Sequence, residues 1–290
     1  MSYEVKTGLR ENIGQFSLLV LINAFVGGMA GMERSILPRI ANEEFHIAAK
    51  TAILSFIVVF GITKAISNYF SGVWANKLGR KNLLTVGWLF GLPVPFILMY
   101  ATNWNMILAA NVLLGINQGL AWSSTVVMKI DLAGDKQRGL AMGLNEFAGY
   151  LSVALVAFFT GWVAATYGLR PYPFYIGIVL SVLGLLSTVF LVKDTKKHIL
   201  SEATTSKVPR LGNTFRDTTW HHRNLSSVTQ AGLINNLNDG MAWGVLPILL
   251  AAKGFSIAQI GIVTAIYPAV WGIGQLFTGK MSDIFCKKDM

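Results

Sequence analysis

The chain has 290 residues, of which 53% are hydrophobic and only 13% are charged, and its net charge is +10. Soluble domains carry about 25% charged residues, and the apolar residues here gather in runs of about 18 or more, the length of a helix that crosses a bilayer. These values exclude an ordinary soluble domain and predict an all-α membrane protein that crosses the bilayer several times.

Eight apolar segments are long enough to span a membrane as helices. Short turns connect them, except that a polar segment, residues 193–225, separates the sixth from the seventh. Within this segment, residues 214–225 are predicted to form an amphipathic surface helix, with Phe215 and Trp220 at the membrane interface. The predicted spans are residues 13–38, 51–74, 82–101, 105–128, 139–165, 172–192, 226–251 and 258–278.

The distribution of Lys and Arg predicts the orientation of these spans. With the N-terminus in the cytoplasm, 18 of the 24 fall in cytoplasmic segments and 4 in outer segments, while Arg34 and Lys64 lie inside spans. The basic excess therefore indicates topology, and no nucleic-acid partner is predicted. The expected location is the plasma membrane, or the inner membrane of a bacterium, with the lipid bilayer as the partner.

The first two spans carry ionisable residues, which are costly inside a membrane and therefore functional candidates. Glu33 and Arg34 lie near the outer end of the first span and point about 100° apart, so they are not expected to face one ligand. Each is a candidate for a gate or a binding site, with structural pairing as the alternative. Lys64 lies about mid-span and shares one helix face with Asn68 and Ser71, which favours a functional or paired role.

A short basic turn, residues 72–81, joins the second and third spans. Gly72 and Gly79 allow the helices and the turn to approach closely. Arg80 and Lys81 can bind helix C-termini, carboxylates or lipid phosphate, although ordinary positive-inside anchors would look the same.

Amide side chains are frequent in the fourth and fifth spans. Asn111 and Gln118 share one face of the fourth span, with Asn117 nearby, and Asn145 lies on a similar face of the fifth. Such a face can hydrogen-bond a ligand, and hydrogen bonds between helices are the alternative. Glu146 is expected near the inner end, where it would pair with a basic loop.

The seventh span places Asn235, Asn238 and Asp239 at about mid-depth, followed by Trp243. Polar residues at this depth are further candidates for a substrate or coupling site.

The chain contains an internal repeat. Residues 279–288 repeat the pattern of the basic turn, with Gly279 and Asp283 at its start, and residues 240–247 share four of eight positions with residues 31–38. Both copies start on the same side, which predicts a parallel repeat of six-span units. A second unit would need four more spans, so the sequence is interpreted as a fragment or a truncated form.

The basic turn resembles the diagnostic motif of the major facilitator superfamily, Gly-x-Leu-Ala-Asp-Arg-x-Gly-Arg-Arg/Lys, found between helices two and three. Gly72, Gly79, Arg80 and Lys81 match this motif, while Asn76 stands where the family usually has Asp. The chain is identified as a member of that superfamily, similar to helices one to eight of twelve.

This resemblance implies a fold and a set of roles. The fold would be a complete six-helix N-terminal half (residues 1–192), an interdomain loop (193–225) and the first two helices of the C-terminal half (226–290). The basic turn would act as a conformational latch between the halves, with Asp131 as the acidic partner of the motif Arg. Helices one, four and seven would line the central cavity.

The implied function is secondary transport of a small-molecule substrate by alternating access, with a proton as the coupling ion. The charged residues themselves allow two hypotheses. Arg34 could pair with Asp239 across the halves to close an outer gate; alternatively, Arg34 or Lys64 binds an anionic substrate, while Glu33 or Asp239 carries the coupling proton. Gly115 stands where drug antiporters of the family have Arg, so this sequence does not specifically indicate drug antiport.

The alternative function is a non-transporting membrane sensor, or an inactive truncated product. Enzyme chemistry is not predicted, because no phosphate-cradling loop or paired catalytic carboxylates are visible. No cofactor or metal is expected either, since the adjacent His221 and His222 have no third ligand nearby in the sequence.

Overall fold

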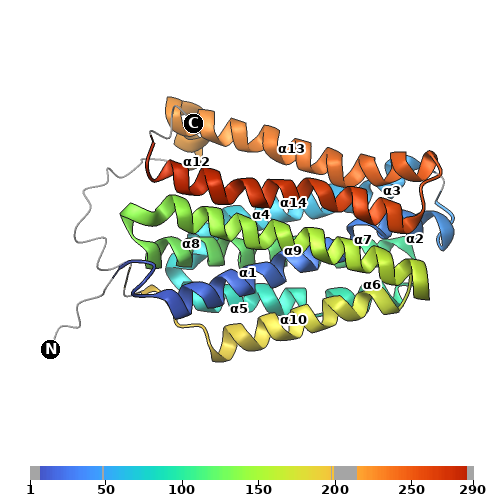
Figure 1. The fold of residues 1–290 in the computed structure, drawn as a ribbon, viewed down its shortest axis with the longest axis horizontal. Helices are drawn as coiled ribbons and strands as arrows, with labels where there is room; N and C mark the ends of the chain where they lie inside the picture. The colour runs from blue at the N-terminus through green and yellow to red at the C-terminus, as the bar shows by residue number, and fades with distance from the viewer. Residues whose placement is uncertain (1–6, 48, 197, 199–213, 286–290) are drawn as a thin grey trace.

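The computed structural model describes residues 7–47, 49–196, 198 and 214–285. Its elements are helices, as predicted, and the long ones run side by side in one elongated bundle (Figure 1). In chain order they are α1 (Ile13–Arg34), α2 (Leu37–Glu43), α3 (Lys50–Ile53), α4 (Ser55–Leu78), α5 (Arg80–Gly91), α6 (Val94–Tyr100), α7 (Trp104–Asn117), the π-helical turn η1 (Gln118–Trp122), α8 (Ser123–Ala133), the 3₁₀ turn η2 (Asp135–Gln137), α9 (Arg138–Tyr167), α10 (Tyr172–Phe190), α12 (Thr214–Arg216), the π-helical turn η3 (Asp217–His221), α13 (Arg223–Ala252) and α14 (Ile257–Ser282).

Seven of the eight predicted spans are long and apolar enough to cross a membrane. The exception is the seventh predicted span, α13, which has the length, but whose middle carries Asn235, Asn236, Asn238 and Asp239 and is more polar than the other spans. Its passage through the membrane stays a prediction. The seven spans are Ile13–Glu43, Thr51–Ala75, Arg80–Tyr100, Trp104–Ala133, Arg138–Tyr167, Tyr172–Phe190 and Ile257–Met281.

Two predicted spans are interrupted near a proline, which cannot donate a backbone hydrogen bond. α1 ends at Arg34 and the chain continues as α2, which has Pro38 in its first turn and ends at Glu43. The third span is divided into α5 and α6 around Pro93. Arg34 is therefore the last residue of its helix, where a long side chain can turn away from the helix axis.

The fourth span is longer than predicted. α7, η1 and α8 form one path that reaches Ala133, and a π-helical turn covers Gln118–Trp122 in its middle. Lys129, expected in a cytoplasmic loop, is instead completely buried in α8, and its Nζ donates to the carbonyl oxygen of Leu19 at 3.2 Å. Extra helical turns in this span explain the error.

The predicted surface helix over residues 214–225 is only partly present. α12 and η3 end at His221, the backbone of His222 is extended, and α13 begins at Arg223. Phe215 and Trp220 are exposed, and the Phe215 ring lies edge-on to that of Tyr69 at 5.6 Å.

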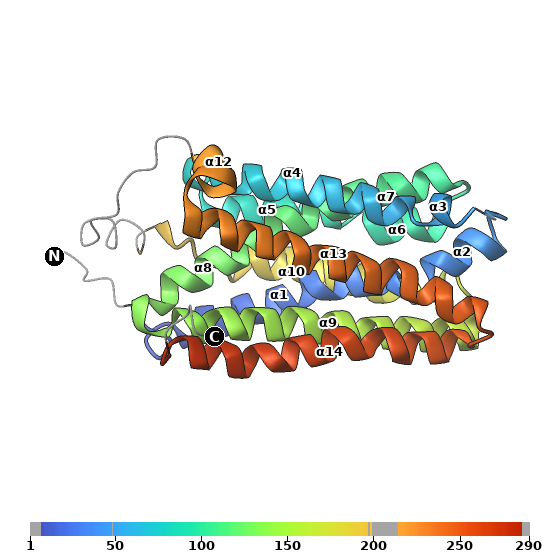
Figure 2. The same ribbon diagram turned by 90° about the horizontal axis from the view of Figure 1, so that it is seen from above.

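α14 lies along α9, and α13 lies between α4 and α14 (Figure 2). In lipid no hydrophobic force drives helices together, so close packing depends on small residues. A side chain on Gly143 would collide with the backbone of α14 at Gln275, and one on Gly279 would collide with the backbone of α9 at Gly139. We call this contact the glycine seam. It joins the first part of the chain (α1 to α10, six predicted spans) to the second part (α13 and α14).

Candidate functional site

A cavity of about 570 Å³ lies between α4 and α13, at the contact of the two parts of the chain. Its wall includes one charged residue from each of α1, α4 and α13, namely Arg34, Lys64 and Asp239. Phe60 and Trp243 add aromatic surface to the same wall. Five of the predicted site residues are thus brought together from distant parts of the sequence: Arg34, Lys64, Asn68, Asp239 and Trp243.

The guanidinium group of Arg34 is buried and has no hydrogen-bond partner. The residue is 2% exposed, and none of its three nitrogens is bonded to another described residue. Its central carbon lies 4.8 Å from the centre of the Phe60 ring and 4.5 Å from that of Trp243. Ring faces attract a cation but do not replace hydrogen-bond acceptors, so the donors of Arg34 remain unsatisfied.

Lys64 is the second cation of the cavity. Its Nζ lies 5.8 Å from the Phe60 ring centre and 5.7 Å from that of Trp122. Within the described part of the chain it has no hydrogen-bond or ion-pair partner, and its charge and that of Arg34 repel each other. Asn68, one turn further along α4, also lines the cavity and accepts a hydrogen bond from Ser123 at 2.8 Å.

Asp239 is held by two tyrosines from two different helices. Tyr150 of α9 donates to Oδ2 at 3.0 Å, and Tyr267 of α14 donates to Oδ1 at 2.6 Å. Asn238 donates in turn to the Tyr267 hydroxyl at 2.9 Å. This carboxylate therefore links the first six-span part to both helices of the second part.

The predicted ion pair between Arg34 and Asp239 is not formed in this structure. Each lies near enough to act electrostatically on the other, but no ion pair joins them among the described residues. Asp239 is occupied by Tyr150 and Tyr267, and these tyrosines were not identified from the sequence. The sequence does contain a signal for Tyr150, because it follows Glu146 by one helical turn and so lies on the same face of α9.

Glu146 also differs from its prediction. It accepts hydrogen bonds from Asn145 at 2.6 Å and from the indole of Trp122 at 3.3 Å, and so faces the bundle rather than a basic loop. Glu33, fully buried, accepts from Asn111 at 3.2 Å through Oε2. As predicted, Glu33 and Arg34 do not point to one place, because Glu33 contacts α7 whereas Arg34 faces α4 and α13.

The amides of the fourth span bond to neighbouring backbone. Asn117 donates to the carbonyl oxygen of Gly87 at 2.9 Å, and Gln118 donates to that of Val26 at 2.7 Å. Both are fully or almost fully buried. Between the two readings of this face, the geometry favours hydrogen bonds between helices. Asn235 lies on α13 outside the cavity wall.

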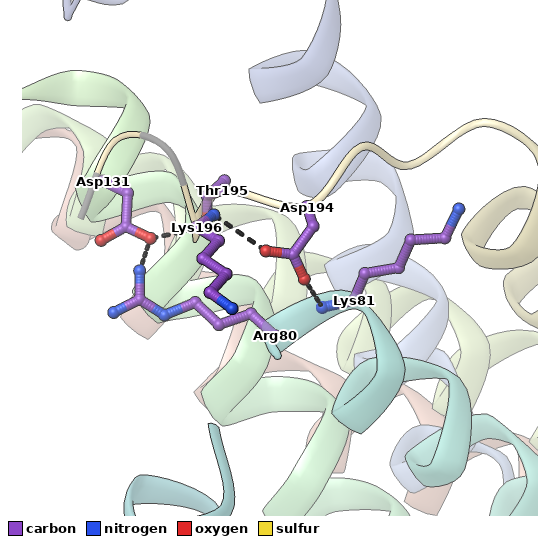
Figure 3. A network of polar contacts seen from close by, with 6 residues as sticks. All are labelled: Arg80, Lys81, Asp131, Asp194, Thr195 and Lys196. Carbon is purple, nitrogen blue, oxygen red and sulfur yellow. Dashed lines mark hydrogen bonds and ion pairs between the residues drawn. The ribbon is translucent and has the colours of Figure 1, made fainter. Parts of the chain in front are cut away.

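At the end of the bundle where α4 meets α5, the basic turn forms a network with two acidic residues (Figure 3). Arg80 forms an ion pair with Asp131, as the sequence predicts, and Asp131 also accepts from Thr195 at 2.6 Å. The backbone N–H of Lys81 donates to Asp194 at 3.0 Å. These contacts connect the turn to α8 and to the segment that follows α10.

The two glycines of the turn differ. Gly79 has φ of +84°, a conformation that side chains rarely adopt, and a Cβ there would meet the Asp194 carboxylate at 3.0 Å. Gly72 has open space around it. The Asn76 side chain, a predicted latch residue, lies outside the described residues.

The second copy of the motif binds a helix N-terminus. Asp283 accepts from the backbone N–H of Gly139 at 2.6 Å and of Leu140 at 2.9 Å, in the first turn of α9. Free N–H groups and the helix dipole make this end attractive to a carboxylate. Beside it, Gly279 packs on α9 in the glycine seam.

A family model described as Major Facilitator Superfamily matches residues 18–226. Multidrug resistance protein 2 of Bacillus subtilis (strain 168) is 24% identical over 198 residues, which cover 64% of this chain and 47% of that protein. Multidrug resistance protein MdtG of Escherichia coli (strain K12 / DH10B) is 25% identical over 242 residues, covering 78% and 55%. The chain spans about half the length of the curated relatives it matches.

Among solved structures, the crystal structure of a D-xylose-proton symporter is similar with a TM-score of 0.63 and 17% identity, covering 94% of this chain and 70% of that one. The inward-open xylose transporter XylE from E. coli is similar with a TM-score of 0.56 and 15% identity, covering 93% and 70%. At these identities the likeness shows the fold alone.

Proposed function

Because the chain belongs to the Major Facilitator Superfamily, we propose that the protein is a secondary transporter that moves a small solute by alternating access. The superfamily consists of transporters, so the chain is a multi-pass membrane protein and not an enzyme. The solute binds in the cavity between α4 and α13, where the two parts of the chain meet. The membrane is a plasma or inner membrane, with the N-terminus in the cytoplasm.

One observation carries this proposal: two cations, Arg34 and Lys64, line the cavity without hydrogen-bond acceptors from the described residues. A buried charge without a partner costs several kcal/mol or more, so a purely structural role gives no reason for such a pair. Inside a membrane, ionisable residues that face a cavity mark a substrate or ion pathway.

We assign the coupling proton to Asp239. The groups that face it are Tyr150 from α9 and Tyr267 from α14, and Arg34 and Lys64 act on it electrostatically from α1 and α4. A proton on Asp239 removes its attraction for the two cations. It also weakens the hydrogen bond that one of its oxygens accepts from a tyrosine hydroxyl. Since those contacts join the two parts of the chain, protonation would change how firmly the parts hold together.

The basic turns act as the latch at the cytoplasmic end. Arg80 with Asp131 fixes the first turn to its own six-helix part, whereas Asp283 binds the N-terminus of α9 across the two parts. The second contact is the one that must open when the parts separate at this end.

The proposal is tested with the full chain in proteoliposomes, with and without a pH gradient. Labelled solutes would include organic anions, hydrophobic cations and xylose. We expect one class to move against its gradient when a pH gradient is imposed, in a direction that the sidedness of the assay reports. Binding without movement of any solute would support the non-transporting alternative.

A further inference from the structure

We propose that the substrate of this cavity is a small organic anion with a carboxylate, sulfonate or phosphate group beside an apolar or aromatic body. This inference rests on the proposed function, because it names the class of solute for the same cavity. The cavity wall, its hydrogen bonds and its aromatic surface carry the inference.

The hydrogen bonds around the cavity are unbalanced in one direction. The carboxylate in its wall already has donors, since Asp239 has two tyrosine hydroxyls. Outside the wall, Glu146 has Trp122 and Asn145, and Glu33, which faces α7, has Asn111 on Oε2 but, within the described chain, no donor on Oε1. The two cations, in contrast, have no acceptor among the described residues. What the site lacks is therefore an acceptor, and the strongest acceptor for a cation is an oxyanion.

The form of the cation matches such a ligand. A guanidinium presents its N–H groups in a planar fork that fits the two oxygens of a carboxylate, or two oxygens of a phosphate or sulfonate. All the nitrogens of Arg34 are available for this contact. Lys64 adds a compact second charge at the same wall.

The rest of the wall fits an apolar body. Ile57, Phe60, Leu237 and Trp243 line it together with the cations. A volume of about 570 Å³ is that of a site for an organic molecule, and an inorganic ion would leave most of this apolar wall uncovered. A cationic drug, by comparison, would face two positive charges whose acidic neighbours are already hydrogen-bonded.

A lipid headgroup carries the same oxyanion chemistry, and the cavity wall includes Val58 and Ile62, which are exposed on the outside of the bundle. The test must therefore separate a free anion from an anionic lipid. Protein prepared in detergent provides one arm, and nanodiscs of phosphatidylcholine with and without phosphatidylglycerol provide the other.

Binding is measured by isothermal titration calorimetry with benzoate, 2-naphthoate and phenyl phosphate, and with benzamide and 2-naphthamide as neutral matches. We expect at least one anion to bind at least roughly tenfold more tightly than its neutral match, because hydrogen bonds to charged groups contribute about this much. Arg34→Gln and Lys64→Gln should each weaken the binding by a similar factor, and Arg34→Lys should weaken it less than Arg34→Gln. Lys253→Gln, an exposed lysine between α13 and α14, is the matched control and should bind as the unmodified chain does.

Equal affinity for the anion and its amide, or unchanged binding in correctly folded Arg34→Gln, would overturn the inference. So would a result in which only phosphatidylglycerol raises thermal stability in an Arg34-dependent way, since the acceptor would then be a lipid. Arg34-dependent anion binding without uptake in proteoliposomes would retain this inference and contradict the proposed function. Transport of a neutral or cationic solute without anion binding would do the reverse.

Discussion

Arg34 contributes less to the stability of the folded chain than an apolar side chain would in the same place. Its nitrogens are buried without acceptors, and its charge is offset by the rings of Phe60 and Trp243 and by nearby carboxylates that do not hydrogen-bond to it. Such residues are retained at functional sites at the expense of stability. Asp239 shows the opposite condition, with a donor for each oxygen. The first residue is suited to receive a ligand, whereas the second joins α13 to α9 and α14 through the tyrosines.

Arg34→Met should raise the thermal unfolding temperature of the ligand-free protein by a few degrees, because an unpaired buried charge is replaced by an apolar side chain of similar length. Binding of the anions should be lost in the same variant. The measurement is differential scanning fluorimetry with and without 2-naphthoate. Arg39→Met, which breaks the exposed ion pair with Glu43, is the control and should not raise the temperature. A large drop in the temperature for Arg34→Met would show that Arg34 has a structural role.

Asp239→Asn should retain substrate binding and abolish the effect of a pH gradient on uptake, since Asn keeps the size and one acceptor but cannot carry the proton. Counterflow, which needs no net proton movement, should continue in this variant. Glu33→Gln is the comparison, because Glu33 is also buried and was an equal candidate for the proton in the sequence. If Glu33→Gln loses proton coupling and Asp239→Asn keeps it, the assignment moves to Glu33.

Among the elements, the two basic turns have diverged in what they contact. The first reaches Asp131 and Asp194 within its own part, and the second reaches the N-terminus of α9 through Asp283. α9 itself carries the seam glycines Gly139 and Gly143, Tyr150 and the N-terminus that Asp283 binds. It therefore connects the latch at the basic end of the bundle with the cavity wall in the middle.

Asp283→Ala should reduce transport while expression and membrane insertion stay normal, because it removes the carboxylate that binds the first turn of α9. A cap of this kind contributes about 1 kcal/mol, so a roughly fivefold shift between the two conformations is expected. Arg80→Ala should also impair transport, through the first turn. The measurement is initial uptake rate per inserted protein, with Lys280→Ala, exposed on α14, as the control. Normal uptake in both variants would contradict the latch.

For the whole molecule, the sequence was sufficient to predict the class of fold and seven of the spans, while the repeat stays a prediction. Hydropathy and Lys/Arg counts act over whole segments, so errors of a few residues do not change them. The Arg80–Asp131 contact also follows from the sequence, because the family motif specifies it.

The arrangement inside the cavity could not be predicted in the same way. Tyr150 and Tyr267 contact Asp239 across helices that are far apart in the chain, and hydropathy treats both as ordinary interface tyrosines. The predicted fourth span ends at residue 128, which leaves Lys129 in a loop. The helical path in fact continues through a π-helical turn to Ala133, so Lys129 is buried within it. Which amide faces a ligand and which bonds a backbone carbonyl depends on helix rotation, which periodicity defines only to within a residue.

The glycine seam has a mechanical consequence. α9 and α14 touch through backbone along Gly139, Gly143 and Gly279, so they have little room to slide or separate. While Asp283 stays bound to the N-terminus of α9, this contact is the fulcrum on which the two parts rock, and displacement increases with distance from it. The widest excursion then falls at the opening between α4 and α13, which is the cavity itself.

Spin labels can measure this lever directly. In a chain whose single cysteine, Cys286, is replaced by Ala, labels at Ile62 on α4 and Leu237 on α13 should show a distance that changes when substrate is added. Labels at Met142 on α9 and Thr278 on α14, which line one surface pocket with Gly143 and Gly279, should show an almost constant distance. A larger distance change between the labels on α9 and α14 would place the axis of rotation elsewhere. The expected result would show that the cavity opens and closes by rotation about the contact of these two glycine-rich helices.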